Sequence, residues 1–262
     1  MSKTRFIGCL AAKGGVGKTT SSINLSAALG VFGKSVIIVD GNLTTPNVGI
    51  YLGVPIAPIT LHDVLRGKNE IEEAVYTHRD GVKIVPASIA LKDVKKLDIS
   101  RLKSSVSELY GESDFIILDG AAGLGKESIA AIKAIDEVII ITNPEMPAVT
   151  DALKTIKIAK ELKKKVLGVV VTKTNVKNAD MSIKDIEHIL ETPVIGIIPE
   201  DRAIKFSQVR KETVIHAYPK SAAAIQYKKL AADLVGEEYN EGIELQNSGF
   251  IYGVLKYLGF KD

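Results

Sequence analysis

Short apolar runs recur along the 262-residue chain, and segments of helical periodicity separate them. The runs are rich in β-branched residues and stay apolar throughout, which is typical of parallel strands that helices cover on both faces. We place strands at residues 5–11, 35–40, 82–86, 115–119, 137–142, 166–172 and 194–199. This alternation predicts an α/β fold, a doubly wound and mostly parallel sheet flanked by helices.

Two of the intervening segments carry an apolar stripe at helical spacing, one in residues 20–32 and the other in residues 148–162. Such a stripe predicts a helix that packs on the sheet. The stripe residues are Ile23, Ala27, Ala28 and Val31 in the first segment and Leu153, Ile156 and Ala159 in the second.

The chain reads as one domain, residues 1–235, followed by a tail. Residues 236–248 form an acidic linker with four glutamates and no basic residue, and residues 249–262 are apolar again. If helical, this last segment places its aromatic and aliphatic side chains on one broad face, the pattern of an amphipathic helix that lies on a membrane. The same segment also fits a tail that folds back onto the domain or docks on a partner protein.

Composition excludes several classes of protein. With 46% hydrophobic and 25% charged residues the chain is an ordinary globular one, and the single cysteine, Cys9, can form neither an internal disulfide nor a multi-cysteine metal cage. No apolar run approaches the length of a membrane-spanning helix. The net charge of +3 is spread along the chain, so nucleic acid is not expected as a partner, and we expect a cytoplasmic protein.

The strongest chemical signal is the loop between the first predicted strand and the first predicted helix. Its glycines allow a tight turn, so that backbone N–H groups and the helix N-terminus point into one anion hole. Lys18 can then reach the β and γ phosphates of a nucleotide, and the Thr19 hydroxyl can bind magnesium. Crowded turns are expected at Gly14, Gly15 and Gly17. The predicted nucleotide-binding residues of the loop are Ala12, Gly14, Gly15, Val16, Gly17, Lys18, Thr19 and Thr20.

With a lysine at position 13, this loop resembles that of the MinD/ParA family of deviant Walker A ATPases, which reads Lys-Gly-Gly-x-Gly-Lys-Thr. Further similar motifs follow in order over residues 5 to about 235 and are closest to the archaeal-type MinD branch. They are residues 39–42, 46–47, 118–123, 142–145, Asp151 and residues 198–201.

The resemblance implies an ATPase that uses ATP, ADP and Mg²⁺. Lys13 would reach across a nucleotide-sandwich homodimer to the phosphates bound by the partner subunit. Gly123 would sense the γ phosphate through its N–H group. The implied catalytic residues are Lys13, Lys18, Asp40 and Asn42, and the implied magnesium ligands are Thr19, Asp40 and Asp119, where both aspartates end predicted strands.

Asn42 departs from the family pattern. Members that hydrolyse ATP well usually carry aspartate there, which orients the attacking water. An amide cannot accept the proton as a carboxylate can, but its carbonyl oxygen can still hold the water. We therefore expect slow ATP hydrolysis. A natural slow switch, another group that replaces the aspartate, and a trapping substitution all remain open.

By the same resemblance, the adenine would lie between residues 172–175 and residues 199–201. Thr172 stands where many relatives have asparagine, so direct reading of the base by this residue is open. Glu200 and Asp201 fit equally well the first turn of a helix, where the helix dipole favours acidic residues. The candidate base-binding residues are Lys173, Asn175, Pro199, Glu200 and Asp201.

The resemblance thus predicts an ATP-dependent positioning switch. The ATP-bound dimer would associate peripherally and reversibly with the cytoplasmic membrane through residues 249–262. There it would position an unidentified regulatory or cargo protein, or machinery of cell division or the cell surface. Two alternatives are a nucleotide-gated scaffold with little hydrolysis and a ParA-like partition ATPase on DNA. The apolar tail and the lack of a basic stripe argue against the latter.

Overall fold

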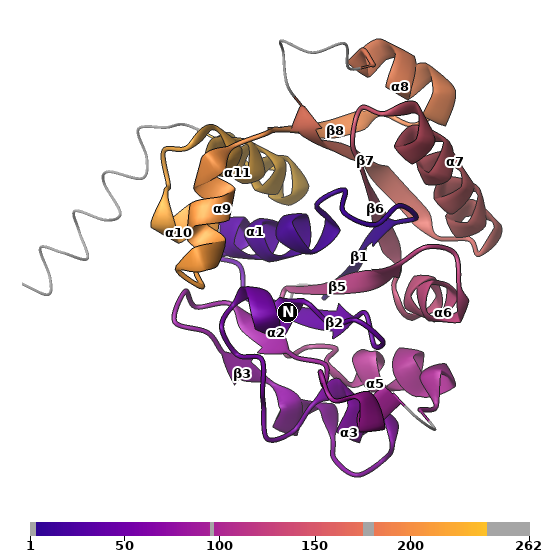
Figure 1. Ribbon diagram of the computed structural model, residues 1–262, viewed down its shortest axis with the longest axis vertical. Helices are drawn as coiled ribbons and strands as arrows, with labels where there is room; N and C mark the ends of the chain where they lie inside the picture. Colours follow the sequence, from indigo (N-terminus) through magenta and orange to yellow (C-terminus); the bar gives the residue numbers. More distant parts are fainter. Residues whose placement is uncertain (1–3, 95–96, 175–180, 240–262) are drawn as a thin grey trace, which may run out of the picture.

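An eight-stranded sheet runs through the centre of the computed structural model, which describes residues 4–94, 97–174 and 181–239 (Figure 1). The strand order is β3-β4-β2-β5-β1-β6-β7-β8, and every described pair of neighbours is parallel except β3 with β4. The strands are β1 (Arg5–Ala11), β2 (Val36–Gly41), β3 (Tyr76–Thr77), β4 (Lys83–Val85), β5 (Phe115–Ala122), β6 (Glu137–Thr142), β7 (Lys165–Thr174) and β8 (Val194–Pro199).

This sheet confirms the predicted fold class. All seven predicted strands form, with ends that differ by a few residues. The sequence missed β3, because a strand of two residues carries no periodic signal. Tyr76 and Thr77 pair antiparallel with β4 and form one edge of the sheet.

Helices cover both faces of the sheet (Figure 1). One apolar core includes residues of α1, α10 and α11, and the other includes residues of α3, α5, α6, α7 and α8. The α-helices are α1 (Lys18–Val31), α2 (Val48–Tyr51), α3 (Leu61–Leu65), α4 (Leu91–Val94), α5 (Leu102–Glu108), α6 (Lys126–Ala134), α7 (Met146–Glu161), α8 (Ile183–Leu190), α9 (Arg202–Val209), α10 (Val214–Ala217) and α11 (Ala222–Val235), and the 3₁₀ helices are η1 (Ile71–Ala74) and η2 (Ile99–Arg101).

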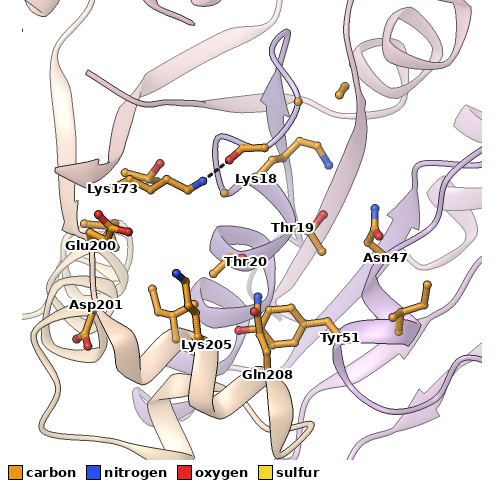
Figure 2. A pocket seen from close by; sticks show the side chains of 18 of the residues that line it. Lys18, Thr19, Thr20, Asn47, Tyr51, Lys173, Glu200, Asp201, Lys205 and Gln208 are labelled. Carbon is orange, nitrogen blue, oxygen red and sulfur yellow. Dashed lines mark hydrogen bonds between the residues drawn. The ribbon is translucent and has the colours of Figure 1, made fainter. Parts of the chain in front are cut away.

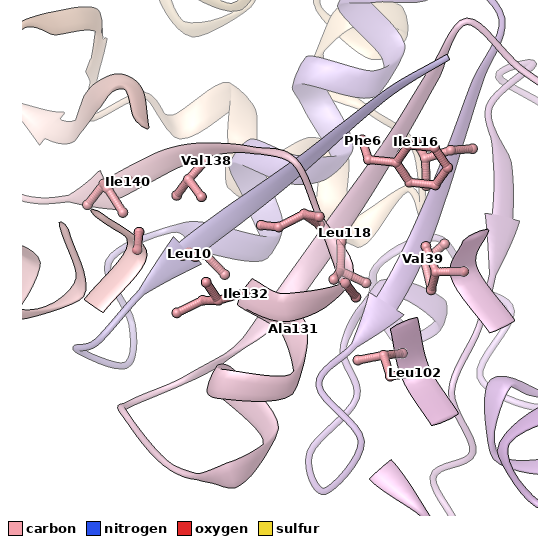
Figure 3. Packing of buried hydrophobic residues seen from close by; sticks show 14 of the residues in the cluster. Phe6, Leu10, Val39, Leu102, Ile116, Leu118, Ala131, Ile132, Val138 and Ile140 are labelled. Atoms are coloured by element: carbon pink, nitrogen blue, oxygen red, sulfur yellow. The ribbon is translucent and has the colours of Figure 1, made fainter. Parts of the chain in front are cut away.

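Packing of helices on the sheet fixes the strand ends that carry the chemistry. Ala131 and Ile132 of α6 lie in one core with Leu10 of β1 and Leu118 of β5 (Figure 3). Each large aliphatic side chain buried in this way contributes about 1.5–3 kcal/mol to folding. The ends of β1 and β5 are thereby held in one place relative to each other.

Of the predicted stripe on α1, Ile23, Ala27 and Ala28 are buried, but Val31 is 40% exposed, so its prediction was wrong. Val31 is the last residue of α1, and the following Phe32 packs against the core.

Cys9 is buried in β1. Among the described helices none is long and apolar enough to cross a bilayer. Helix α11 ends at Val235, and Gly236 follows it with φ 74°. The predicted division at residues 235 and 236 remains a prediction, because residues 240–248 of the linker and the whole segment 249–262 lie outside the described residues.

Candidate functional site

A cavity of about 730 Å³ opens where β1, β2, β7 and β8 end. Carboxyl ends of parallel strands are where doubly wound sheets bind ligands. Lys18 and Thr19 lie on one wall of the cavity (Figure 2). Asp201, after β8, and Tyr51, on α2, lie on opposite sides. The predicted phosphate loop and the predicted base-binding segment therefore share one cavity.

The phosphate loop turns at Gly15 and Gly17, with φ values of 77° and 89°, in the left-handed region that favours glycine. Gly14 lies outside that region. A Cβ at Gly14 or at Gly15 would meet nothing within 4 Å among the described residues, so the crowding expected at these two positions was wrong, although the backbone does turn at Gly15. Gly17 is the N-cap of α1, and no described side chain caps this helix. The first N–H groups of α1 are therefore available to an anion.

Asp119 is the centre of a buried network behind the loop. Its Oδ1 lies 2.7 Å from Lys18 Nζ and accepts a hydrogen bond of 2.9 Å from the Ser22 hydroxyl, and its Oδ2 accepts one of 2.6 Å from Thr19 Oγ1. Asp119 is fully buried and Lys18 nearly so. The structure thus brings together the predicted phosphate-binding lysine and two predicted magnesium ligands, and it adds Ser22, which sequence reasoning missed.

Asp40 is also fully buried, and it organises the loop that follows β2. Its Oδ2 accepts hydrogen bonds of 2.9 Å from the backbone N–H groups of Asn47 and Val48, and its Oδ1 accepts one of 3.2 Å from Asn42 N–H. Burial, followed by the negative charge of Asp119, raises the pKa of Asp40 to about 7.

Two buried carboxylates beside one lysine leave an excess of negative charge that suits a divalent cation. The described residues contain no group of three or more His, Cys, Asp or Glu side chains that could hold a metal ion by themselves. Protein oxygens at Thr19, Asp40 and Asp119 would thus supply part of a magnesium shell, and nucleotide phosphates and water the rest. The residues present fit Mg²⁺ as the ion that accompanies a nucleotide.

Asn42 lines the cavity and is held by its own loop. Its Nδ2 donates a hydrogen bond of 2.5 Å to the carbonyl oxygen of Thr45, and its Oδ1 accepts one of 3.1 Å from Thr45 Oγ1. These contacts fix the amide plane before any ligand binds. Whether this amide holds the attacking water stays a prediction.

Lys13 lies at the outer edge of the cavity and forms an ion pair within its own chain. Its Nζ is 2.6 Å from Oε2 of Glu145, and the lysine and glutamate side chains are 36% and 53% exposed. The hydrogen bond from Lys13 is the largest cause of the lowered pKa of Glu145. Asn143 Nδ2 donates to the other oxygen of Glu145 at 2.6 Å. Glu145 belongs to the motif at residues 142–145, but the sequence does not predict its contact with Lys13.

On the predicted base side, two side chains brace the phosphate loop. The hydroxyl of Thr172 lies 2.5 Å from the carbonyl oxygen of Val16 and 3.1 Å from that of Thr142. A hydroxyl has one hydrogen, so this donor is already engaged by backbone. Lys173, at φ 55°, donates from Nζ to the carbonyl oxygen of Gly15 at 2.6 Å (Figure 2).

Asp201 is the N-cap of α9, and Glu200 precedes it, so neither residue lies in the first turn of the helix, where the helix interpretation placed them. Its Oδ1 accepts from Ala203 N–H at 2.8 Å and its Oδ2 from Ala223 N–H at 3.0 Å. Asp201 and Glu200 nevertheless line the cavity. The carboxylate of Asp201 is therefore committed to backbone groups on two helices and positions this wall of the cavity.

Most predicted site residues line the cavity: Lys13, Gly14, Gly15, Gly17, Lys18, Thr19, Thr20, Asn42, Lys173, Pro199, Glu200 and Asp201. Ala12, Val16, Asp40, Asp119 and Gly123 do not, and the Gly123 N–H group donates to the carbonyl oxygen of Ala11 at 3.2 Å. Asn175 lies outside the described residues. That these residues bind nucleotide or metal stays a prediction.

Sequence reasoning did not identify the lower part of the cavity. Tyr51 of α2, Gln208 of α9 and Tyr227 of α11 line it, and they come from elements far apart in the sequence. The Tyr227 hydroxyl lies 3.1 Å from Ser21 Oγ, near the start of α1. No local motif marks these residues, because only tertiary packing, with α11 against α1 and α9 against α10, brings them to the cavity.

Comparison with known proteins agrees with this geometry. The model of a family described as AAA domain matches residues 4–186. An uncharacterized ATP-binding protein of Methanocaldococcus jannaschii is 35% identical over 94% of this chain and 93% of its own length. The septum site-determining protein MinD of Synechocystis is 31% identical over 89% and 90%.

Solved structures extend the similarity to three dimensions. The septum site-determining protein MinD of Pyrococcus horikoshii, complexed with Mg-ADP, has 34% identity and a TM-score of 0.85, covering 88% of this chain and 96% of that one. MinD in the MinC:MinD cell division complex of Aquifex aeolicus has 29% identity and a TM-score of 0.79, covering 90% and 97%.

Proposed function

Because this chain belongs to the MinD/ParA-type family of P-loop ATPases, we propose that it is a slow ATP-dependent switch that dimerises around Mg-ATP. The observation that carries the proposal is the convergence of Lys18, Thr19 and Asp119 on one buried network beneath the N-terminus of α1. These groups provide what a nucleotide phosphate needs, namely N–H donors, one cation and oxygen ligands for a metal ion.

In this proposal the backbone N–H groups of residues 14–19 and the Nζ of Lys18 bind the phosphates. Thr19, Asp119 and Asp40 would hold Mg²⁺, whose charge offsets that of the phosphates when it is bound. Lys18 exchanges part of its contact with Asp119 for phosphate oxygens. The aromatic ring of Tyr51 and the residues after β8 enclose the rest of the nucleotide.

We propose that Asn42 orients the attacking water through its carbonyl oxygen. Asn42 lies at the end of β2 beside the phosphate loop, and Thr45 fixes its amide. Phosphoryl transfer depends mainly on positioning and electrostatics, so an amide supports turnover, but without the proton acceptance of a carboxylate. The consequence is a long-lived ATP state.

We further propose that Lys13 leaves Glu145 and binds the phosphates of a second copy. The pair is exposed, and exposed ion pairs contribute only about 0–1 kcal/mol, so this exchange costs little. In the dimer the second positive charge would add to that of Lys18. The ATP-bound dimer would then position an unidentified partner protein at the membrane, consistent with the MinC:MinD complex of the Aquifex relative.

Membrane attachment would come from residues 249–262, which lie outside the described part of the chain. One such segment, with two lysines and three glycines, would bind lipid feebly. Two segments in an ATP dimer would bind about a hundredfold more tightly or better, because the second binding event becomes intramolecular. Nucleotide state would thereby set a reversible location on the cytoplasmic face of the membrane.

The proposal is tested by ATP turnover together with sedimentation of the ATP-bound chain, in the wild type and in Asn42→Asp. We expect a slow wild-type rate, an ATP-dependent dimer, and a rate about tenfold higher in Asn42→Asp because a carboxylate can accept the proton of the water. An unchanged rate in Asn42→Asp would mean that residue 42 does not contact the water.

The other outcomes distinguish the alternatives. A stable ATP dimer without turnover would replace the cycling switch by a nucleotide-gated scaffold, which the amide at position 42 favours. Salt-sensitive retention of the ATP dimer on DNA would favour a ParA-like partition ATPase. A chain that stays monomeric with ATP would contradict the proposed dimer.

Attachment is tested by flotation with anionic liposomes. Removing residues 249–262 should abolish ATP-dependent flotation and leave the affinity for ATP unchanged, since the described residues already supply the phosphate loop and the walls of the cavity. A matched control carries Glu241→Gln and Glu244→Gln in the linker and should still float. Equal flotation of the truncated chain would assign the tail to the domain or to a partner protein.

A further inference from the structure

His62 is fully buried on α3, outside the cavity, and both of its ring nitrogens contact backbone groups. The backbone N–H of Ser88 donates to Nδ1 at 3.0 Å, and Nε2 lies 3.1 Å from the carbonyl oxygen of Leu43. Because a backbone N–H can only donate, Nδ1 must be the acceptor, and Nε2 carries the hydrogen that it donates to Leu43. Burial lowers the pKa of His62, in agreement with a neutral ring.

Leu43 directly follows Asn42, so His62 holds the loop that carries the proposed water-orienting amide. Asp40 binds backbone N–H groups at both ends of this loop, at Asn42 and at Asn47. His62 binds a carbonyl oxygen between them. The loop is therefore fixed by two side chains, one that accepts and one that donates.

The other side of the ring is anchored just as firmly. The hydroxyl of Ser88 donates to Oδ2 of Asp93 at 2.6 Å, and Oδ1 of Asp93 lies 2.9 Å from NH1 of Arg66. Arg66 is the C-cap of α3, the helix that carries His62. This closed set of contacts leaves the ring little freedom to rotate.

We propose that His62 is a positioning residue for ATP hydrolysis: its Nε2–H fixes the Leu43 carbonyl and thereby the direction in which the Asn42 amide enters the nucleotide cavity. This inference rests on the proposed function of Asn42. It assigns to His62 no contact with nucleotide or water. His62 acts through the peptide group that joins residues 43 and 44, immediately after Asn42.

A matched pair of substitutions isolates the Leu43 contact. In His62→Gln the amide nitrogen can occupy about the position of Nε2, which retains a donor for Leu43 but not the acceptor for Ser88. In His62→Asn the amide lies about where Nδ1 was, which retains the acceptor but not the donor. Each variant loses one buried hydrogen bond, so their thermal stabilities should fall by similar amounts.

We expect ATP turnover at saturating ATP to fall about tenfold in His62→Asn and less than about threefold in His62→Gln, because small displacements of a positioning group reduce rate more than binding. The affinity for ADP should change less than about twofold in both. His188→Asn, on the exposed side of α8, is the surface control and should match the wild type.

A double-mutant cycle with Asn42→Ala tests whether His62 acts through Asn42. In the Asn42→Ala background, His62→Asn should lower turnover no further. An equal fall in both backgrounds would overturn the proposal, as would equal falls in His62→Gln and His62→Asn. Normal turnover in His62→Asn would overturn this proposal alone, whereas absence of turnover in the wild type would overturn the proposed hydrolysis and this inference with it.

A measurement on the wild-type chain requires no variant. The ¹⁵N shifts of the His62 ring should report a neutral imidazole with its hydrogen on Nε2 at neutral pH. A hydrogen on Nδ1, or a charged ring, would overturn the proposal because the donor to Leu43 would then be absent or Ser88 N–H would face another donor.

Discussion

Two lysines of the same loop form ion pairs of nearly the same length in very different surroundings. Lys18 lies 2.7 Å from Asp119, with exposures of 8% and 0%, and Lys13 lies 2.6 Å from Glu145, with exposures of 36% and 53%. Removing one member of a buried pair leaves an uncompensated charge, whereas an exposed pair contributes little. Distance alone therefore does not rank the two contacts.

The difference separates a fixed interior half of the site from an exchangeable outer half. Lys18 begins α1, and its side chain reaches Asp119 within β5, where Thr19 and Ser22 bind the same carboxylate. Lys13 lies before the turn, and among the described residues its Nζ pairs with the solvent-exposed Glu145 side chain. In our proposal the interior half binds the chain's own nucleotide, and the outer half is free to change partner on dimerisation.

Lys18→Ala breaks the interior half and should have the largest effect. It leaves the buried carboxylate of Asp119 without its cation, which costs about 3–5 kcal/mol of folding free energy. It should also weaken Mg-ADP binding about a hundredfold or more. Thermal unfolding measures the change in stability, and titration calorimetry measures the change in affinity. A variant with near wild-type stability would contradict the expected contribution of the buried ion pair to folding.

Lys13→Ala breaks the outer half and is the matched comparison. The free energy of unfolding should change by less than about 1 kcal/mol, because the pair is exposed. The affinity of the monomer for Mg-ADP should stay within about threefold, while the ATP-dependent dimer is lost. Sedimentation that still shows the dimer would remove the proposed role of Lys13 across the interface.

Glu145→Gln tests the same comparison by changing the other member of the exposed ion pair. If Glu145 only holds Lys13 in the monomer, removing its charge should leave the ATP dimer intact and strengthen dimerisation slightly, within about fivefold. Analytical ultracentrifugation over a concentration series measures the dimer dissociation constant. A large loss of dimer would instead place Glu145 in the interface itself.

The last prediction concerns pH and the second buried carboxylate. Asp40 has its pKa raised from 3.8 to about 7, so between these values the folded chain retains a proton that the unfolded chain releases. The contribution of Asp40 to the free energy of unfolding of the nucleotide-free chain should therefore decrease as the pH rises from about 4 to about 7. Above pH 7 it should stay constant. Asp40→Asn should lack this part of the pH-dependent loss of stability, because an amide does not titrate.

Thermal unfolding at several pH values between 5 and 8 compares the two nucleotide-free chains. The wild type should lose stability relative to Asp40→Asn as the pH rises through this range. Curves that stay parallel would contradict the raised pKa of Asp40.

The fold was predictable because it depends on signals local in sequence. Continuous apolar runs predicted seven strands, and one loop pattern predicted the turn and the start of α1. The Asp40 and Asp119 carboxylates were predictable too, since the ends of parallel strands meet at one edge of the sheet. The segment after β8 also lines the cavity, and its contact with a base stays a prediction.

The sequence by itself thus determined the sheet, the phosphate loop and the carboxylates beside it, because consecutive residues and strand ends specify them. Only the tertiary structure decided the contacts between distant elements: Thr172 against Val16, Tyr227 beside Ser21, Lys13 on Glu145, and His62 between Leu43 and Ser88. Each of these contacts depends on how helices pack across the sheet and on which side chains are removed from water. No local sequence pattern encodes which distant segments come together in this way.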